Sequence, residues 1–182
     1  MVDDVITFDV AWYFSLVIAG ALGVAITTVA NLATTVYLHR GLSHRALTFS
    51  RPARGVFRFV LWLTTGIRPR QWVAVHRKHH AHTDTVEDPH SPVIHGWWKV
   101  QVRNYAMYRQ AARDATNTER FAKDLPADRF DKVLFDRALL GLGTGISILV
   151  LLFGPLIAVA AAVVHLNYYI AANSAVFSRA RI

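Results

Sequence analysis

VAWYFSLVIAGALGVAITTVANLATTVYL, residues 10–38, contains no formally charged side chain. At about 1.5 Å rise per residue, this stretch predicts a helix about 43 Å long, which exceeds the roughly 30 Å hydrocarbon core of a bilayer. We therefore expect a transmembrane helix over residues 10–38 whose last turns protrude into the aqueous interface and carry His39 out of the lipid.

A second uncharged stretch, residues 138–178, contains only His165 as a titratable side chain. It is long enough for two crossings, and Pro155 lacks a backbone donor. We expect a transmembrane hairpin that turns at Gly154–Pro155 and whose short first leg draws on residues 133–137. Hydrophobic residues make up 53 % of the chain. The pattern predicts a single all-α membrane domain over residues 1–182, with about three transmembrane helices and a cytosolic, helical, histidine-rich loop.

Positive charge is confined to the part of the chain after the first span. All 20 Lys and Arg residues lie at or after Arg40, whereas the N-terminal tail carries Asp3, Asp4 and Asp9. Because basic flanks prefer the cytoplasmic side, we expect the N-terminus outside and the histidine-rich loop and C-terminus in the cytosol, in the inner membrane of a bacterium. The net charge of +8 is explained by these cytoplasmic basic residues. A nucleic-acid-binding face is the weaker explanation, because no recognition motif accompanies the charge. The first span also lacks the basic region of a signal peptide.

The loop over residues 39–137 divides into distinct parts. Residues 59–67 are apolar but too few to cross a membrane, so we interpret them as a re-entrant or interfacial segment. Residues 97–113 are rich in aromatic residues and arginine, which indicates a helix on the membrane surface. Residues 114–136 are polar and predict a cytosolic connection. In the hairpin, the glycines of Gly141-Leu-Gly143-Thr-Gly145 predict close helix packing and not a phosphate loop, because no strand precedes them.

The chain has no cysteine, and five of its nine histidines form two clusters. These clusters are His39-Arg-Gly-Leu-Ser-His44 and His76-Arg-Lys-His79-His80. A single histidine here is more simply an interfacial polar residue, and we interpret His82, His90, His95 and His165 in that way, with contact to a metal ligand or to the substrate as the alternative. Two clusters at one membrane face instead predict a transition-metal site, and imidazoles without thiolate suit iron, copper or zinc. Five ligands beside a membrane favour two metals with open positions over a closed structural site.

The spacing within each cluster predicts how its rings converge. The second cluster lies in residues 70–81, which lack Gly and Pro and predict a helix. Its three histidines stand at i, i+3 and i+4 and are expected to share one face. The two histidines of the first cluster are five residues apart, which is about 140° on an α-helix. We expect them to converge only because the helix ends between them, near Gly41.

Both clusters resemble motifs of one protein family. His39-Arg-Gly-Leu-Ser-His44-Arg45 resembles the HxxxxH box of membrane fatty acid desaturases of the acyl-CoA, delta-9 type. The segment from Trp72 to Pro92, with its Asp88-Pro89-His90, resembles their HxxHH box with the upstream tryptophan and downstream DPH. The resemblance implies a di-iron centre that uses dioxygen and two electrons from a ferredoxin- or cytochrome-type donor with its reductase. This centre would insert a double bond into a saturated acyl chain held by CoA, acyl carrier protein or lipid.

The resemblance also implies a ligand set and a departure from it. By matching position, the metal ligands would be His39, His44, His76, His79 and His80, with Asn173 reaching the metal through water. In Asn173-Ser174-Ala175-Val176-Phe177, phenylalanine stands where the family's NSxxH motif has a histidine ligand, and the family's third histidine box does not follow. We expect a desaturase truncated before that third box, in preference to a degenerate remnant, with weak or absent activity in this chain alone.

Two other function classes stay open. A related histidine-rich membrane lipid hydroxylase would give hydroxylated product, although the first box and the DPH tail favour the desaturase. A non-enzymatic membrane protein that stores or senses metal would hold stoichiometric zinc or copper and no iron. The tryptophans are interpreted as interface anchors or as walls of an acyl tunnel. They are Trp62, Trp72, Trp97 and Trp98.

Overall fold

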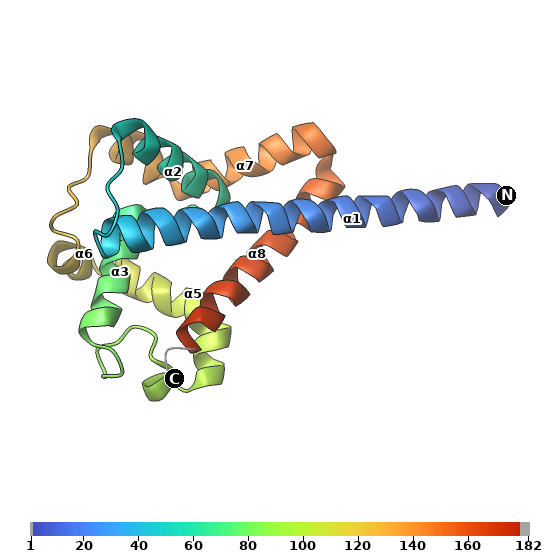
Figure 1. The fold of residues 1–182 in the computed structure, drawn as a ribbon. Helices are drawn as coiled ribbons and strands as arrows, with labels where there is room; N and C mark the ends of the chain where they lie inside the picture. Colours follow the sequence, from blue (N-terminus) through green and yellow to red (C-terminus); the bar gives the residue numbers. More distant parts are fainter. Residues whose placement is uncertain (1, 179–182) are drawn as a thin grey trace.

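The N-terminal helix is the longest element of the molecule (Figure 1). The computed structural model describes residues 2–178, with side chains for residues 12–173, and every regular element in that part is helical. α1 (Val2–Ala33) continues without a break into a π-helical segment, η1 (Thr34–Ser43). The other helices are α2 (Arg51–Thr64), α3 (Pro69–Ala81), α4 (Pro92–His95), α5 (Trp97–Arg113), α6 (Ala115–Phe121), the π-helical η2 (Asp131–Phe135), α7 (Ala138–Phe153) and α8 (Pro155–Ser178). The chain is therefore all-helical over the described residues, as the sequence predicted.

Within the residues that the structure describes, two helices are long and apolar enough to cross a membrane. They lie over Trp12–Ser43, of 32 residues, and Pro155–Asn173, of 19 residues. The predicted hairpin turn is confirmed, because α7 ends at Phe153 and Gly154 adopts a φ of +80° before Pro155 starts α8. A left-handed φ of this kind favours glycine.

The expectation that residues 133–137 extend the first leg of the hairpin is wrong. These residues belong to η2 and the turn after it, and α7 remains a helix of 16 residues. Arg137 leaves the helical conformation, with φ −91° and ψ 69°. The indole of Trp62 donates to the Arg137 carbonyl over 3.1 Å, so an α2 side chain satisfies the backbone at the break.

Polar side chains join α1 and the start of η1 to α8 along an otherwise apolar interface. Three pairs contribute: Thr27 with His165 at 2.9 Å, Thr34 with Tyr169 at 2.8 Å, and Asn173, which donates to Asn31 over 3.0 Å. In lipid, such hydrogen bonds between helices contribute about 0.6 to 2 kcal/mol each. They fix the register of α8 on α1, which in turn places the cavity described below.

Glycines let α2 approach α7 closely. A side chain at Gly141 would collide with the Trp62 carbonyl, and one at Gly145 with the Leu63 carbonyl. The prediction of close packing for these glycines is confirmed, whereas Gly143 has open space around it. Residues 59–64 of the apolar segment 59–67 also prove to be the end of a longer helix, because α2 begins at Arg51 with Ser50 as its cap, whereas residues 65–67 lie beyond this helix.

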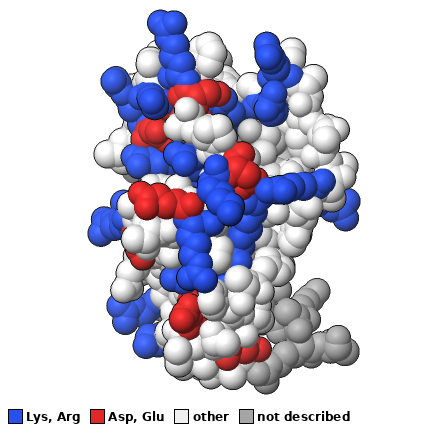
Figure 2. Space-filling view, turned by 90° about the vertical axis from the view of Figure 1, so that its left-hand side faces the viewer, with Lys and Arg blue, Asp and Glu red and all other residues white. Residues whose placement is uncertain are grey.

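The histidine-bearing elements gather at one end of the molecule. Figure 1 shows α3, α5 and α6 together beside the η1 end of the long helix. The predicted helices over residues 70–81 and 97–113 are confirmed, since α3 and α5 have nearly the same bounds. Many Lys and Arg side chains, interspersed with Asp and Glu, cover this end (Figure 2).

Candidate metal centre

The first histidine cluster lies on the π-helical segment η1. The amide of His44 donates to the carbonyl of His39 over 3.0 Å, a bond that spans five residues. In a π-helix, this i→i+5 bond stacks residues five apart on one side of the helix. The rings of His39 and His44 therefore meet with centroids 4.5 Å apart.

The expectation that the helix ends near Gly41 is therefore wrong. The helix widens and continues to Ser43, whose hydroxyl donates to the carbonyl of Leu38 over 2.9 Å. Gly41 serves packing instead, because a side chain there would collide with the ring of Phe49. Widening the helix brings the two histidines together without the break that the spacing suggested.

The second cluster supplies two further rings from α3. His76 and His80 are one turn apart, and their Nε2 atoms lie 3.1 Å from each other. The Nε2 of His76 also lies 3.4 Å from the Nε2 of His44. One ring nitrogen from each of these four residues lies within 4.8 Å of the others. We call His39, His44, His76 and His80 the four-histidine group.

The surroundings of the group favour neutral imidazoles. Burial, followed by the neighbouring His80, His39 and His44, lowers the pKa of His76 to about 2. Burial and then His79 and His44 also lower the pKa of His80. Neutral rings present nitrogen lone pairs, and converging imidazole nitrogens are a donor set that suits iron, copper or zinc. The residues of the group therefore fit a transition-metal ion.

Trp72 holds the central ring of the group. Its indole stacks on the ring of His76, with centroids 4.7 Å apart and an angle of 15° between the planes. His76 is 8 % exposed, so the ring is enclosed by this stack and by the other three histidines. The upstream tryptophan of the motif thus orients a histidine.

His79 does not join the four-histidine group. The ring of His79 is a neighbour of the His80 ring, with centroids 5.5 Å apart, but its Nδ1 lies 2.9 Å from both carboxylate oxygens of Asp88. The ring of His79 also stacks on that of His90, with centroids 4.7 Å apart. We call His79, Asp88 and His90 the carboxylate cluster, whose ligand-type atoms also lie within 4.8 Å of one another.

Asp88 is a buried carboxylate with several donors. Burial opposes its ionisation, but hydrogen bonds from His79 and from the His90 and Asp84 amides outweigh burial and lower its pKa. An ionised Asp88 accepts the Nδ1 proton of His79, which makes Nε2 the atom able to bind a metal. Burial lowers the pKa of His90 to about 4. The sequence marked Asp88 only as part of the DPH tail. The interpretation of His90 as an interfacial polar residue is wrong, because His90 is buried, 4 % exposed, beside His79 and Asp88.

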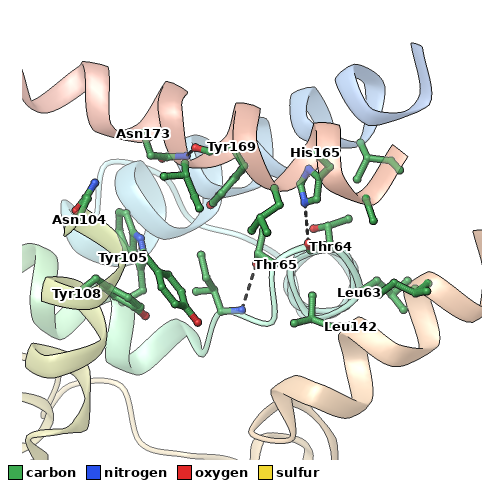
Figure 3. A pocket seen from close by; sticks show the side chains of 18 of the residues that line it. Leu63, Thr64, Thr65, Asn104, Tyr105, Tyr108, Leu142, His165, Tyr169 and Asn173 are labelled. Atoms are coloured by element: carbon green, nitrogen blue, oxygen red, sulfur yellow. Dashed lines mark hydrogen bonds between the residues drawn. The ribbon is translucent and has the colours of Figure 1, made fainter. Parts of the chain in front are cut away.

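An apolar cavity of about 660 Å³ adjoins the four-histidine group and the carboxylate cluster. His76 and His90 line one part of it, and helices α1, α2, α3, α5, α7 and α8 supply the rest. Figure 3 shows Tyr105 and Tyr108 projecting from α5, opposite the α8 side chains. A cavity of this kind can hold the hydrocarbon part of a ligand beside the histidines.

The remaining predicted residues occupy varied places. Asn173 lines the cavity and donates to Asn31, outside the four-histidine group. Trp72 also lines the cavity, Trp62 is buried between α2 and α7, and Trp97 and Trp98 are exposed. Phe177 lies outside the residues whose side chains are described.

His165 has a role that the sequence did not indicate. Its Nε2 donates to the carbonyl of Thr64 over 2.8 Å, at the end of α2 (Figure 3). Its Nδ1 lies 2.9 Å from the hydroxyl of Thr27 on α1. His165 therefore joins three helices at the cavity wall. An isolated histidine inside an apolar run was the available signal, because such a residue needs polar partners in lipid.

Comparisons with known proteins identify relatives of this chain. A family model described as fatty acid desaturase matches residues 15–179. The chain is 37 % identical over 76 residues to the Delta-9 desaturase-like 2 protein of Arabidopsis thaliana, a match covering 42 % of this chain and 25 % of the relative. It is 42 % identical over 65 residues to the Acyl-CoA C20 Delta5-desaturase of Anemone leveillei, covering 36 % and 20 %. It is 40 % identical over 71 residues to the Delta-9 acyl-lipid desaturase 1 of Arabidopsis thaliana, covering 39 % and 23 %. The matches span at most about a quarter of these relatives, and no solved structure matches.

Proposed function

The chain belongs to the fatty acid desaturase family, and from that premise we propose that it binds iron and a saturated fatty acyl chain for dioxygen-dependent desaturation. One observation carries the proposal: His76, the central ring of the four-histidine group, lines an apolar cavity of about 660 Å³. An oxidant for an unactivated C–H bond must act beside the hydrocarbon that it attacks, and this arrangement brings a metal-type donor set and an apolar site together.

We assign the metal ligands from the two histidine clusters. His39, His44, His76 and His80 would hold one iron through nitrogens that already converge. His79 would contribute to a second iron through Nε2, because Asp88 occupies its Nδ1. Asn173 would act through water. Orientation of a ligating histidine by a carboxylate is a recurrent arrangement in metal sites.

The bound iron pair would supply dioxygen activation, with two electrons from a ferredoxin- or cytochrome-type donor. The balanced reaction converts one CH₂–CH₂ unit, dioxygen, two electrons and two protons into one CH=CH unit and two waters. The chain's own part is to bind and orient the substrate. Apolar side chains such as Ile146 and Leu149 line the cavity and exclude water. Each buried methylene contributes about 0.8 kcal/mol to binding.

We propose three membrane crossings within a single domain, with α7 as the second. Its 16 residues rise about 24 Å, less than a hydrocarbon core of about 30 Å. Local thinning and snorkelling of Arg137 at its start would accommodate the mismatch. The basic end in Figure 2 would then face the cytosol, with the N-terminus outside, in a bacterial inner membrane.

The acyl carrier is left open by the relatives. One relative is named for an acyl-CoA substrate and another for an acyl-lipid substrate. Both kinds of substrate share the hydrocarbon chain that the cavity suits. The proposal therefore commits to the acyl chain, with CoA, acyl carrier protein or a lipid as the group that holds it.

Metal analysis and lipid analysis test the proposal together. The chain is purified from iron-supplemented cells as wild type, His44→Ala and the control His95→Ala, which lies on α4 outside both clusters. We expect stoichiometric iron in wild type and the control, and loss of iron in His44→Ala. Stoichiometric zinc without iron would support a non-enzymatic metal protein. In cells fed a saturated fatty acid, with ferredoxin and reductase supplied, any product is expected to be monounsaturated, and a hydroxylated product would contradict desaturation.

A further inference from the structure

Arg77, the residue after His76, joins the two histidine boxes through its guanidinium. Its Nη2 donates to the carbonyl of Leu42 over 2.7 Å, and its Nε donates to the carbonyl of Ser43 over 3.2 Å. These two carbonyls belong to the last residues of η1, directly before His44. A side chain from α3 therefore holds the backbone that carries a histidine of the first box.

The same guanidinium is anchored on its other side. Nη1 donates to Asp124 over 2.6 Å and to the carbonyl of Phe121 over 2.9 Å, and Nη2 reaches the second Asp124 oxygen over 3.2 Å. The planar fork of arginine matches a carboxylate in this two-pronged way, and lysine cannot reproduce it. The Arg77 side chain is 19 % exposed, so these bonds are sheltered from solvent.

The end of η1 needs such a donor. The last carbonyls of a helix have no partner within the helix, and those of Leu42 and Ser43 are among them. A π-helical turn is also rare and depends on its surroundings. The hydrogen bonds to these carbonyls also fix the distance between the end of η1 and α3. The 3.4 Å separation between the Nε2 atoms of His44 and His76 depends on that distance.

We infer that Arg77, anchored by Asp124, is a positioning residue that holds His44 against His76 and so assembles the four-histidine group. The inference rests on the proposed function only in that the group binds a metal. Arg77 touches no ring of the group in this role. It acts through the backbone of η1, and its loss would loosen the group without removing a ligand.

A second arginine provides a matched control. Arg58 on α2 also forms a two-pronged pair, with Asp128, and it reaches Asp131 on η2 as well. Its side chain is 13 % exposed, similar to that of Arg77. Neither α2 nor residues 128–135 contains a histidine. Arg58→Lys therefore removes a comparable structural pair that does not touch the metal centre.

The test compares metal binding with stability in the full chain in detergent. Cobalt(II) serves as the probe, since its visible spectrum reports ligand geometry. For Arg77→Lys we expect a dissociation constant about 10- to 100-fold weaker and an altered spectrum, as for other residues that orient ligands. Asp124→Asn, which leaves α3 unchanged, is expected to show the same change to a smaller degree. If Arg77→Lys protein cannot be produced in folded form, Asp124→Asn alone tests the inference. Arg58→Lys is expected to lower the metal-free Tm and to keep the wild-type affinity and spectrum.

Three outcomes would overturn the inference. Unchanged affinity and spectrum in both Arg77→Lys and Asp124→Asn would remove the positioning role and leave the metal centre standing. Equal weakening in Arg58→Lys would show that general loss of stability explains the effect. Failure of the wild-type chain to bind cobalt or iron would overturn the proposed metal centre itself, and the inference with it.

Discussion

The second histidine box divides between two chemical environments. His76 and His80 meet the imidazoles of the first box, so that four rings converge without a carboxylate among them. His79, next to His80 in the sequence, donates to the buried Asp88 and stacks on His90. The comparison teaches that neighbours within one motif can have different roles. Converging neutral nitrogens make a cation site, whereas a carboxylate fixes the tautomer of a single ring.

The largest effect is expected when the ring at the centre of the four-histidine group is removed. His76→Ala deletes the side chain that contacts both His44 and His80. Loss of one of four ligands is expected to weaken cobalt or iron binding roughly 100-fold or more. Anaerobic titration of the purified chain measures this affinity, with His95→Ala as the control. An affinity within a few fold of wild type would contradict the assignment of His76 as a ligand.

Asp88→Asn tests the other side of the comparison. Asp88 accepts hydrogen bonds from His79 and from the backbone N–H groups of Asp84 and His90. The side chain of an asparagine has one oxygen in place of two, so some of these buried donors would lose their acceptor. We expect the free energy of unfolding to fall by about 3 kcal/mol, while the four-histidine group keeps its cobalt affinity. Chemical denaturation in detergent measures the change. The control is Glu87→Gln, which alters a neighbouring exposed carboxylate. Equal losses of metal affinity in Asp88→Asn and His76→Ala would erase the distinction between the two environments.

His165 extends the comparison to a histidine that holds helices together. Both of its ring nitrogens have partners, Thr27 and the Thr64 carbonyl. His165→Leu is expected to lower the free energy of unfolding by about 1 kcal/mol and to leave metal affinity unchanged. The control is Asn167→Leu, because the Asn167 amide donates to the Val163 carbonyl of its own helix and so does not join two helices by this bond. Loss of metal from His165→Leu would show that the cavity wall and the metal centre are coupled.

The smallest effect concerns acid stability at the end of the molecule that carries the Lys and Arg side chains of Figure 2. A hydrogen bond from Arg58 lowers the pKa of Asp128 to about 2, below its ordinary value of 3.8. A carboxyl with a lowered folded-state pKa stabilises the fold above its unfolded pKa and loses that contribution as pH falls. Stability is therefore expected to decline between about pH 4 and pH 2. In Arg58→Gln, thermal unfolding across this window should decline less steeply, and an unchanged slope would remove this pair as a source of acid sensitivity.

Much of the helical framework could be predicted because it depends on local sequence. The turn at Gly154–Pro155 and the bounds of α3 follow from residues that permit or break a helix. The meeting of the two histidine boxes at one end could also be predicted, since both lie in the loop between the two uncharged stretches, which the charge distribution assigns to one membrane face. The fatty acid desaturase family was identified from the resemblance of the two histidine boxes to that family's motifs, and the family model confirmed it.

The rest depends on contacts that no local pattern reveals. The last carbonyls of η1 accept hydrogen bonds from a side chain on another helix, that of Arg77. An α-helical spacing rule predicted that His39 and His44 converge, but it placed a helix end near Gly41 where the helix widens instead. His79 separates from its neighbours because residues 82–91 return Asp88 to its side. Among 20 Lys and Arg residues, nothing in the sequence distinguished Arg77 from those that follow the charge rule.

X-ray absorption of the cobalt-loaded wild-type chain tests most directly whether the four imidazoles share one metal ion. We expect scattering from about four imidazole nitrogens at about 2.0–2.1 Å, with one fewer in His44→Ala. A spectrum dominated by oxygen ligands, with one imidazole or none and no change in His44→Ala, would contradict the account.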